Sequence, residues 1–187
     1  MPSSAWNRSA FTTRPSGAAW SDSAPIRAAL YSDQQLRQHA VELADSHLVV
    51  PTAAPVVTLL TRLREDADVL AVSYRELSRI ADSGAAMTGA AEWFIDNFHV
   101  IDDNIRHVRR DLPHSYMREL PKLGPGFLGG HPRIVAIAWD YVAHTDSLFQ
   151  PDQLANYIRA YETRKALSLG ELWAVPICLR MLLVDNA

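Results

Sequence analysis

Apolar residues recur three or four positions apart through most of the sequence from residue 32 onward, which is the spacing that lines one face of an α-helix. The clearest run lies between Val56 and Ala81, where charged residues separate six apolar ones: Leu60, Leu63, Ala67, Leu70, Tyr74 and Leu77. No segment shows the sustained alternation of apolar and polar residues, bounded by hairpin turns, that is typical of a half-buried strand. The sequence therefore predicts an all-α fold.

Start and stop signals divide the pattern into a bundle of about six helices, over residues 32–50, 56–81, 89–110, 133–146, 151–164 and 168–187. Capping boxes begin two of them, S-x-x-Q at Ser32 and S-x-x-E at Ser168. Pro176 lies inside the last helix and is expected to kink it. Prolines and glycines predict an irregular connector, Asp111–His131, that joins the third and fourth helices.

The domain organisation follows from the same pattern. Residues 1–31 lack helical periodicity and predict a disordered or loosely attached tail. Residues 32–187 predict one helical domain, which we expect to be truncated at its C-terminal end. The chain has 187 residues and 48% hydrophobic residues, enough for a core of its own.

Composition excludes several classes of protein. The net charge of −3 gives no argument for a nucleic-acid partner, which usually requires a basic face. The single cysteine, Cys178, cannot form an internal disulfide and predicts a buried, inert thiol in a reducing compartment. Residues 1–31 contain no signal-peptide core, and no segment reaches the roughly 20 apolar residues of a membrane span. We therefore expect a soluble, cytoplasmic segment.

Two acidic motifs resemble catalytic patterns but favour simpler interpretations. Asp66 and Asp68 match the D-x-D of nucleotide-sugar transferases, yet they lie within a predicted helix on a charged face rather than after a strand. Asp102 and Asp103 superficially match the D-D-x-x-D of prenyl-diphosphate enzymes, but Arg106 replaces the last carboxylate. We expect a solvated face for the first motif and an Asp102–Arg106 ion pair for the second.

The seven histidines show no metal-binding pattern. His99 and His107 are eight residues apart, too far for the i,i+4 chelate of a helical zinc site, and His131 and His144 are more widely separated. Glu92, Asp96, His99 and Asp103 place acids and bases along one helix, but glycoside hydrolysis would also need a sugar-binding cleft. The sequence therefore predicts no catalytic residue, no metal site and no cofactor in this chain.

One stretch is specific enough to indicate a family. It runs from Ala91 to Leu123 and reads AEWFIDNFHVIDDNIRHVRRDLPHSYMRELPKL. This resembles a region near the start of the cyclic β-1,2-glucan synthases, large bacterial membrane enzymes, although acids after Ile101 are aspartates where glutamate is expected. Further matches follow at Gly130, Pro132, Arg133, Ala143–Asp146 and Gly170–Pro176.

The resemblance implies a parent enzyme of the bacterial inner membrane that polymerises glucose from UDP-glucose, with a divalent metal, and closes the chain into a ring. The transferase and phosphorylase-like regions of that family have no counterpart in this sequence, so no catalytic residue can be carried over. It implies a non-catalytic N-terminal helical segment whose partners are the remaining domains of the synthase. The alternative is a free-standing all-α enzyme or binding module that shares the motif.

The connector is the candidate interaction surface because five charged residues gather around it, Arg109, Arg110, Arg118, Glu119 and Lys122, and Tyr116 is included with them. Two interpretations stay open. Arg118 and Glu119 pair with charges on neighbouring helices and fix the loop, or they contact a glucan or another domain of the parent. The first is favoured.

Three further expectations concern the core. The helix over Gly89–Arg110 should be central, with Phe94, Phe98, Ile101 and Ile105 on its buried face. The tryptophans Trp93, Trp139 and Trp173 should pack in the core rather than stack on sugars. The last helix should expose an apolar face and self-associate, because its apolar stripe is wide: Leu172, Trp173, Val175, Ile177, Leu179, Leu182, Leu183 and Val184.

Overall fold

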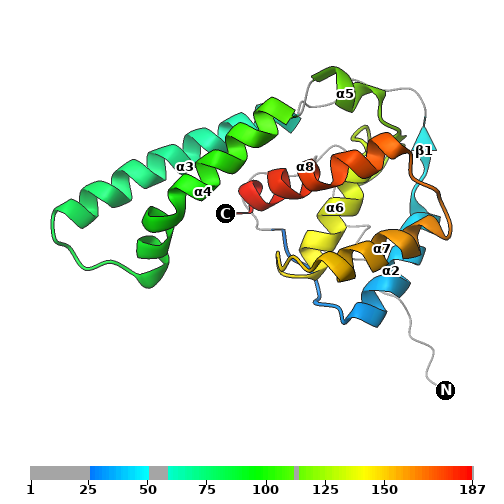
Figure 1. Cartoon of the computed structure of the whole chain (residues 1–187), viewed down its shortest axis with the longest axis horizontal. Coiled ribbons are helices and arrows are strands. Elements are labelled where there is room, and N and C mark those ends of the chain that lie inside the picture. Colours follow the sequence, from blue (N-terminus) through cyan, green and yellow to red (C-terminus); the bar gives the residue numbers. More distant parts are fainter. Residues whose placement is uncertain (1–25, 51–58, 112–113, 187) are drawn as a thin grey trace.

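The computed structural model describes residues 26–50, 59–111 and 114–186, and this part of the chain is mostly helical. Seven helices and one two-stranded sheet follow in the order α2 (Asp33–Ser46), β1 (Val49–Val50), α3 (Leu59–Asp82), α4 (Gly89–Asp111), α5 (His114–Glu119), β2 (Lys122–Leu123), α6 (Arg133–His144), α7 (Pro151–Glu162) and α8 (Leu169–Asp185) (Figure 1). The all-α prediction is confirmed, and each of the six expected helices is present. The short α5 is an addition, because the connector was predicted to be irregular.

Both predicted capping boxes are formed. The Ser32 hydroxyl accepts the N–H of Gln35, and the Gln35 side chain accepts the N–H of Ser32 at 3.0 Å. Ser168 and Glu171 repeat this arrangement at the start of α8. These reciprocal bonds satisfy backbone donors that a helix N-terminus would otherwise leave unpaired.

The first helix ends earlier than predicted, at Ser46 rather than near Val50. His47 already has extended backbone angles, and Val49 and Val50 form β1, which pairs antiparallel with β2. Two consecutive β-branched residues before Pro51 favour an extended backbone, which explains the difference.

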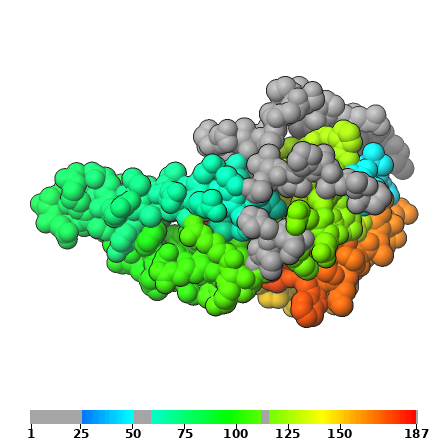
Figure 2. Space-filling model, turned by 90° about the horizontal axis from the view of Figure 1, so that it is seen from above, coloured from blue at the N-terminus to red at the C-terminus, as the bar shows by residue number. Residues whose placement is uncertain are grey.

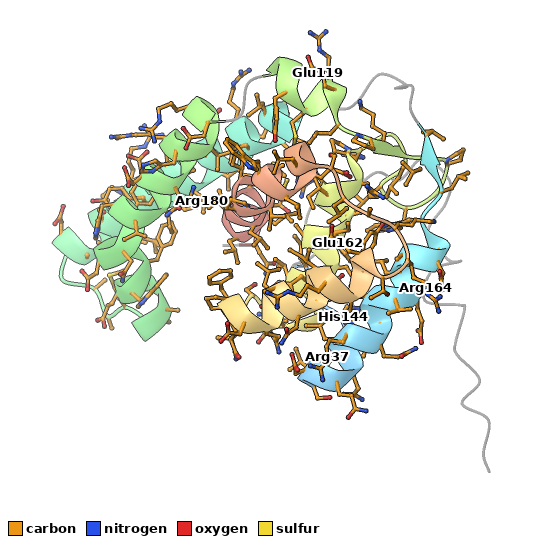
Figure 3. The ribbon with its side chains drawn as sticks, turned by 45° about the vertical axis from the view of Figure 1, so that its right-hand side comes forward. Arg37, Glu119, His144, Glu162, Arg164 and Arg180 are labelled. Atoms are coloured by element: carbon orange, nitrogen blue, oxygen red, sulfur yellow. The ribbon has the colours of Figure 1, made fainter. Side chains whose placement is uncertain are left out.

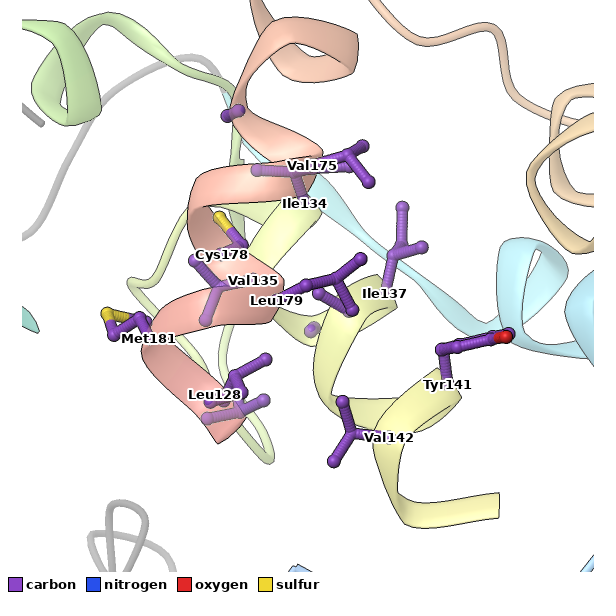
Figure 4. Close-up of a cluster of buried hydrophobic side chains, with 14 of the residues drawn as sticks. Leu128, Ile134, Val135, Ile137, Tyr141, Val142, Val175, Cys178, Leu179 and Met181 are labelled. Carbon is purple, nitrogen blue, oxygen red and sulfur yellow. The ribbon is translucent and has the colours of Figure 1, made fainter. Parts of the chain in front are cut away.

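The centre of the core lies between α6 and α8, as Figure 4 shows. Eleven of the twelve residues of α6 are buried, as its apolar composition predicted. From α8 come Val175, Cys178, Leu179 and Met181, and Leu128 of the connector packs beside them. Cys178 is fully buried, as predicted, and burial raises the pKa of its thiol to about 12, which disfavours the reactive thiolate.

Helices α3 and α4 form a hairpin that projects from the body of the molecule (Figures 1 and 2). From residue 71 to residue 104 no residue of this hairpin is buried. Only the base of α4 is inside, where Ile105 and Val108 are buried and the helix packs on α8. The prediction that the helix over Gly89–Arg110 is central is therefore wrong for its first half, and α6 with α8 takes that place.

The last helix covers only part of its predicted apolar face, since Trp173 stays exposed and Leu172, Ile177 and Leu183 are half-buried. Leu179, Leu182 and Val184 are buried, because α6, α4 and α3 all pack on α8. Its end is also capped: the Asn186 N–H donates to the carbonyl of Leu182, and the Asn186 side chain accepts the N–H of Ile26 at 2.7 Å. The expectation of exposure is therefore wrong for Leu179, Leu182 and Val184, and self-association of the chain stays a prediction.

The segment just before α2 belongs to the helical domain. Ile26 is buried, the Ala28 N–H donates to the Ala143 carbonyl, and the Tyr31 N–H donates to the His144 carbonyl. The domain thus reaches back at least to residue 26 rather than starting at 32. The rest of the predicted tail lies outside the described residues. None of the helices in the described ranges is long and apolar enough to cross a membrane.

Candidate functional site

Two of the six predicted surface residues point into the fold. The Lys122 side chain is only 1% exposed, and its ammonium group donates to the carbonyls of Arg118 at 2.5 Å and of Leu120 at 3.3 Å. The Tyr116 hydroxyl donates to the carbonyl of Gly170 at the start of α8. Tyr116 therefore ties the connector to α8, while Lys122 bonds within the connector and is too buried to serve as a surface residue.

The other four predicted residues lie on the outside. Arg109, Arg118 and Glu119 are exposed, and Arg110 pairs with Asp111 at 2.9 Å. Figure 3 shows Glu119 on α5 at the periphery of the molecule. Neither Arg118 nor Glu119 forms a salt bridge with any residue in the described ranges. The favoured interpretation, pairing with neighbouring helices, is therefore not observed among these residues, where both side chains are exposed.

The connector itself is a closed loop held by backbone hydrogen bonds. The Leu123 N–H donates to His131 at 3.0 Å, and the Gly130 N–H donates back to Leu123 at 2.8 Å. A side chain at Gly129 would bring its Cβ within 2.8 Å of the Gly124 carbonyl oxygen, so only glycine fits there. This loop places Arg133 at the start of α6.

The two carboxylates of the D-x-D motif lie in different environments on α3. Asp68 is exposed, as predicted for a solvated face, but Asp66 is half-buried and faces Asp185 at the end of α8. Burial, followed by the charge of Asp185, raises the pKa of Asp66 to about 6. Arg62 forms an ion pair with Asp185. Since residues two apart on a helix do not face each other, Asp66 and Asp68 do not converge on one site.

The other acidic pattern behaves as expected. Arg106 forms an i,i+4 ion pair with Asp102 on the outside of α4, which confirms the structural interpretation. The four acid and base groups noted along this helix, Glu92, Asp96, His99 and Asp103, are all exposed.

The tryptophans divide into two kinds. Trp139 packs edge-on against Phe127 with ring centroids 4.8 Å apart and is partly buried, in line with the prediction. Trp93 on the hairpin is 62% exposed and Trp173 at the start of α8 is 71% exposed, so for these two the core assignment is wrong. Large exposed aromatic side chains of this kind are common anchors in protein interfaces.

One buried polar cluster escaped the sequence pattern. His39 of α2 lies 2.9 Å from Asp140 of α6 through its Nε2 atom, and the Nε2 atom of His144 lies 3.6 Å from the same carboxylate oxygen, Oδ1. The Tyr157 hydroxyl of α7 donates to the other oxygen, Oδ2, at 2.7 Å. All four side chains are buried. The prediction that the histidines stay apart is thus wrong for His39 and His144.

The sequence did contain a signal for this cluster. Asp140 and His144 are four apart in a helix that is apolar on every other side, and buried polar residues in such a helix need partners. Desolvation by burial lowers the pKa of His144 and raises that of Tyr157 well above its ordinary value. The partner from α2 could not be found from spacing, because His39 lies 101 residues away from Asp140.

Comparison with known proteins gives one family. No family model matches the sequence. The chain is 35% identical over 164 residues to the cyclic beta-(1,2)-glucan synthase NdvB of Rhizobium meliloti (strain 1021). The match covers 86% of this chain but only 6% of that relative, so the chain is similar to a small part of a much larger protein.

Proposed function

The chain belongs by sequence to the cyclic β-1,2-glucan synthase family, and we propose that it acts in such a synthase as a non-catalytic N-terminal helical segment that docks on the remaining domains. In this proposal UDP-glucose and its divalent metal bind elsewhere in the synthase. The segment lies in the cytoplasm, beside a membrane-bound parent.

The projecting hairpin is the observation that carries the docking role. Val69 and Val72 on α3 are exposed and three residues apart, so they share one face of that helix. Trp93 and Val100 on α4 are exposed and two turns apart, and they also share a face. A hairpin with this many exposed apolar side chains, and no buried residue from 71 to 104, gains stability when a partner covers it.

The connector supplies a second set of contacts. Arg118 and Glu119 on α5 are exposed near the exposed Arg109 at the end of α4. Charges around an apolar interface favour the correct orientation of two partners more than they add affinity. We propose that these three residues contact another domain of the synthase. The alternative, which the sequence also allows, is that they contact a glucan.

The geometry of the acidic motif supports a non-catalytic role. A transferase D-x-D motif needs two carboxylates that converge on one metal ion. Asp66 instead faces Asp185 while Asp68 points to solvent, so the two carboxylates do not lie around one common point.

A reconstitution experiment tests the docking role. The NdvB relative is produced without the segment that matches this chain, both proteins are checked for folding by circular dichroism, and the chain is added back. We expect the two proteins to co-purify. Changing Trp93 and Val100 to serine should weaken the complex at least about tenfold, as expected for the loss of an aromatic anchor.

The matched control is Phe149→Ser, which removes an exposed aromatic from the body of the molecule rather than from the hairpin. It should leave binding unchanged. If the folded remainder does not bind the chain, or if the hairpin and control variants behave alike, the docking proposal fails and the free-standing alternative gains.

A further inference from the structure

The structure assigns His39, Asp140 and His144 to a buried site for one divalent transition-metal ion of the zinc class. The three side chains offer two imidazole nitrogens and one carboxylate oxygen, and these ligand atoms all lie within 4.8 Å of one another. Imidazole and carboxylate are ligands that zinc accepts in proteins. The site is separate from the hairpin and does not depend on the docking role.

The spacing of the ligand atoms suits a small cation. Metal–ligand distances of about 2.0–2.2 Å place two ligand atoms of a tetrahedral zinc site about 3.4 Å apart. Asp140 Oδ1 lies 2.9 Å from His39 Nε2 and 3.6 Å from His144 Nε2. A metal ion would draw the three ligand atoms, which all lie within 4.8 Å of one another, to that spacing. Three protein ligands leave a fourth position for water or a neighbouring oxygen.

The hydrogen bonds around the cluster orient the ligands. His144 Nδ1 lies 2.6 Å from the Ala29 carbonyl, which can only accept, so this nitrogen carries the proton. In the neutral ring the Nε2 atom then presents its lone pair toward Asp140. A ligating histidine commonly donates its other N–H to a carbonyl in this way.

The carboxylate is held similarly. The Tyr157 hydroxyl donates to Oδ2 of Asp140 at 2.7 Å, which leaves Oδ1 directed at the two histidines. A lone pair and a carboxylate oxygen face each other favourably only with a proton or a cation between them. The Tyr31 ring stacks on His144, with centroids 4.1 Å apart and planes 7° apart, and fixes the imidazole from its other side.

The site joins parts of the chain that are distant in sequence. His39 comes from α2, Asp140 and His144 from α6, and Tyr157 from α7, while Ala29 and Tyr31 belong to the segment before α2. Figure 3 labels His144 in the region where these helices meet. A metal here would therefore stabilise the body of the protein, since binding energy at such a site adds to folding energy.

Calorimetric titration of the full chain tests the proposal, after removal of any histidine tag and treatment with a chelator. We expect Zn²⁺ to bind at one ion per chain and to raise the melting temperature. His39→Gln and Asp140→Asn, which keep the size and hydrogen-bonding capacity of the side chains, should abolish both effects. Tyr157→Phe should weaken binding by about 10–100-fold, because it removes the hydrogen bond that orients the Asp140 carboxylate.

The control is His47→Gln, another buried histidine, which contacts the Tyr161 hydroxyl instead of the cluster. It should bind Zn²⁺ like the unaltered chain. Because a variant could fail to fold, X-ray absorption of the Zn²⁺-loaded unaltered chain gives an independent readout and should show two imidazole ligands. A folded chain that binds no Zn²⁺, a spectrum without two imidazoles, or unchanged binding in folded His39→Gln would overturn the site and leave a polar network only.

Discussion

Arg133 and Glu171 form a bidentate ion pair inside the protein, with side chains only 6% and 0% exposed. The guanidinium donates to both carboxylate oxygens at 2.8 and 2.7 Å and also to the Ala166 carbonyl at 3.0 Å. The same carboxylate accepts the N–H of Ser168 and so caps α8. One pair therefore fixes the start of α6 against the start of α8, the two helices that enclose the core.

Removal of one partner of this pair should be costly. Arg133→Met leaves the Glu171 charge buried without compensation, so we expect the free energy of unfolding to fall by about 3–5 kcal/mol. Arg37→Met, which removes an exposed i,i+4 pair with Asp33, should cost at most about 1 kcal/mol. Urea denaturation of both variants measures the difference, and equal effects would show that the buried pair adds nothing specific.

Asp66→Asn should stabilise the protein at neutral pH. The folded-state pKa of about 6 lies above the ordinary value, so the protonated carboxyl favours folding at low pH and this contribution is lost as pH rises through about 6. The neutral amide avoids that loss. Because the group is partly solvated, we expect a gain of only about 1 kcal/mol at pH 8.

The pH dependence of this gain is the discriminating measurement. Denaturation curves at pH 4 and pH 8 should show the advantage of the amide at pH 8 and little of it at pH 4. A variant that is less stable than the unaltered chain at pH 8 would contradict the repulsion between Asp66 and Asp185.

Two leucines on the same helix should respond differently to truncation. Leu63 of α3 is fully buried at the base of the hairpin, so Leu63→Ala should cost about 2–5 kcal/mol. Leu77 lies farther out and is only partly buried, and Leu77→Ala should cost clearly less. Thermal unfolding compares them directly. Similar losses would mean that the outer hairpin has a core of its own.

The last turn of α8 should resist amide exchange. Asn186 caps the helix, accepts the N–H of Ile26 and donates to the Ser147 hydroxyl at 2.8 Å. Asn186→Ala should cost about 1–3 kcal/mol, since it leaves polar groups without partners. Hydrogen exchange should show faster exchange at Ile26 and in the final turn of the variant only. Fast exchange there in the unaltered chain would instead indicate a frayed end.

The isolated chain should not turn over UDP-glucose. Incubation with Mg²⁺ or Mn²⁺ should release no UDP above background, because Asp66 and Asp68 do not converge. Metal-dependent release that disappears on changing either aspartate would contradict the non-catalytic role.

Local signals in the sequence predicted the helices well because capping boxes and apolar spacing act within a few residues. Ser32 and Ser168 were identified from their own neighbours, and the structure forms both caps. The position of a helix in the molecule depends on its partners instead. Phe94 and Phe98 have the spacing of a core stripe. In the structure both are only partly buried, because they pack on each other and Phe98 stacks on Tyr74 within a two-helix hairpin.

For the candidate sites too, a local contact could be predicted from the sequence and a contact between distant segments could not. The Asp102–Arg106 pair is local and was predicted correctly. The partnership of His39 with Asp140 depends on a contact between distant segments. Lys122 is an exception, because its ammonium group instead meets carbonyl groups only four and two residues away. Charge alone placed Lys122 on the surface, although a long side chain can be buried when its ammonium group meets carbonyl oxygens.

The burial of Lys122 also determines how this protein reacts with acylating reagents. Lys122 and Lys165 are the two lysines of the sequence, and both ammonium groups donate to backbone carbonyls, Lys165 to that of His47. All other cationic side chains, apart from histidine, are arginines, which such reagents do not modify. Amine-directed coupling to a sensor surface or a fluorophore will therefore be slow at Lys122 and will leave the hairpin, which contains no lysine, unmodified.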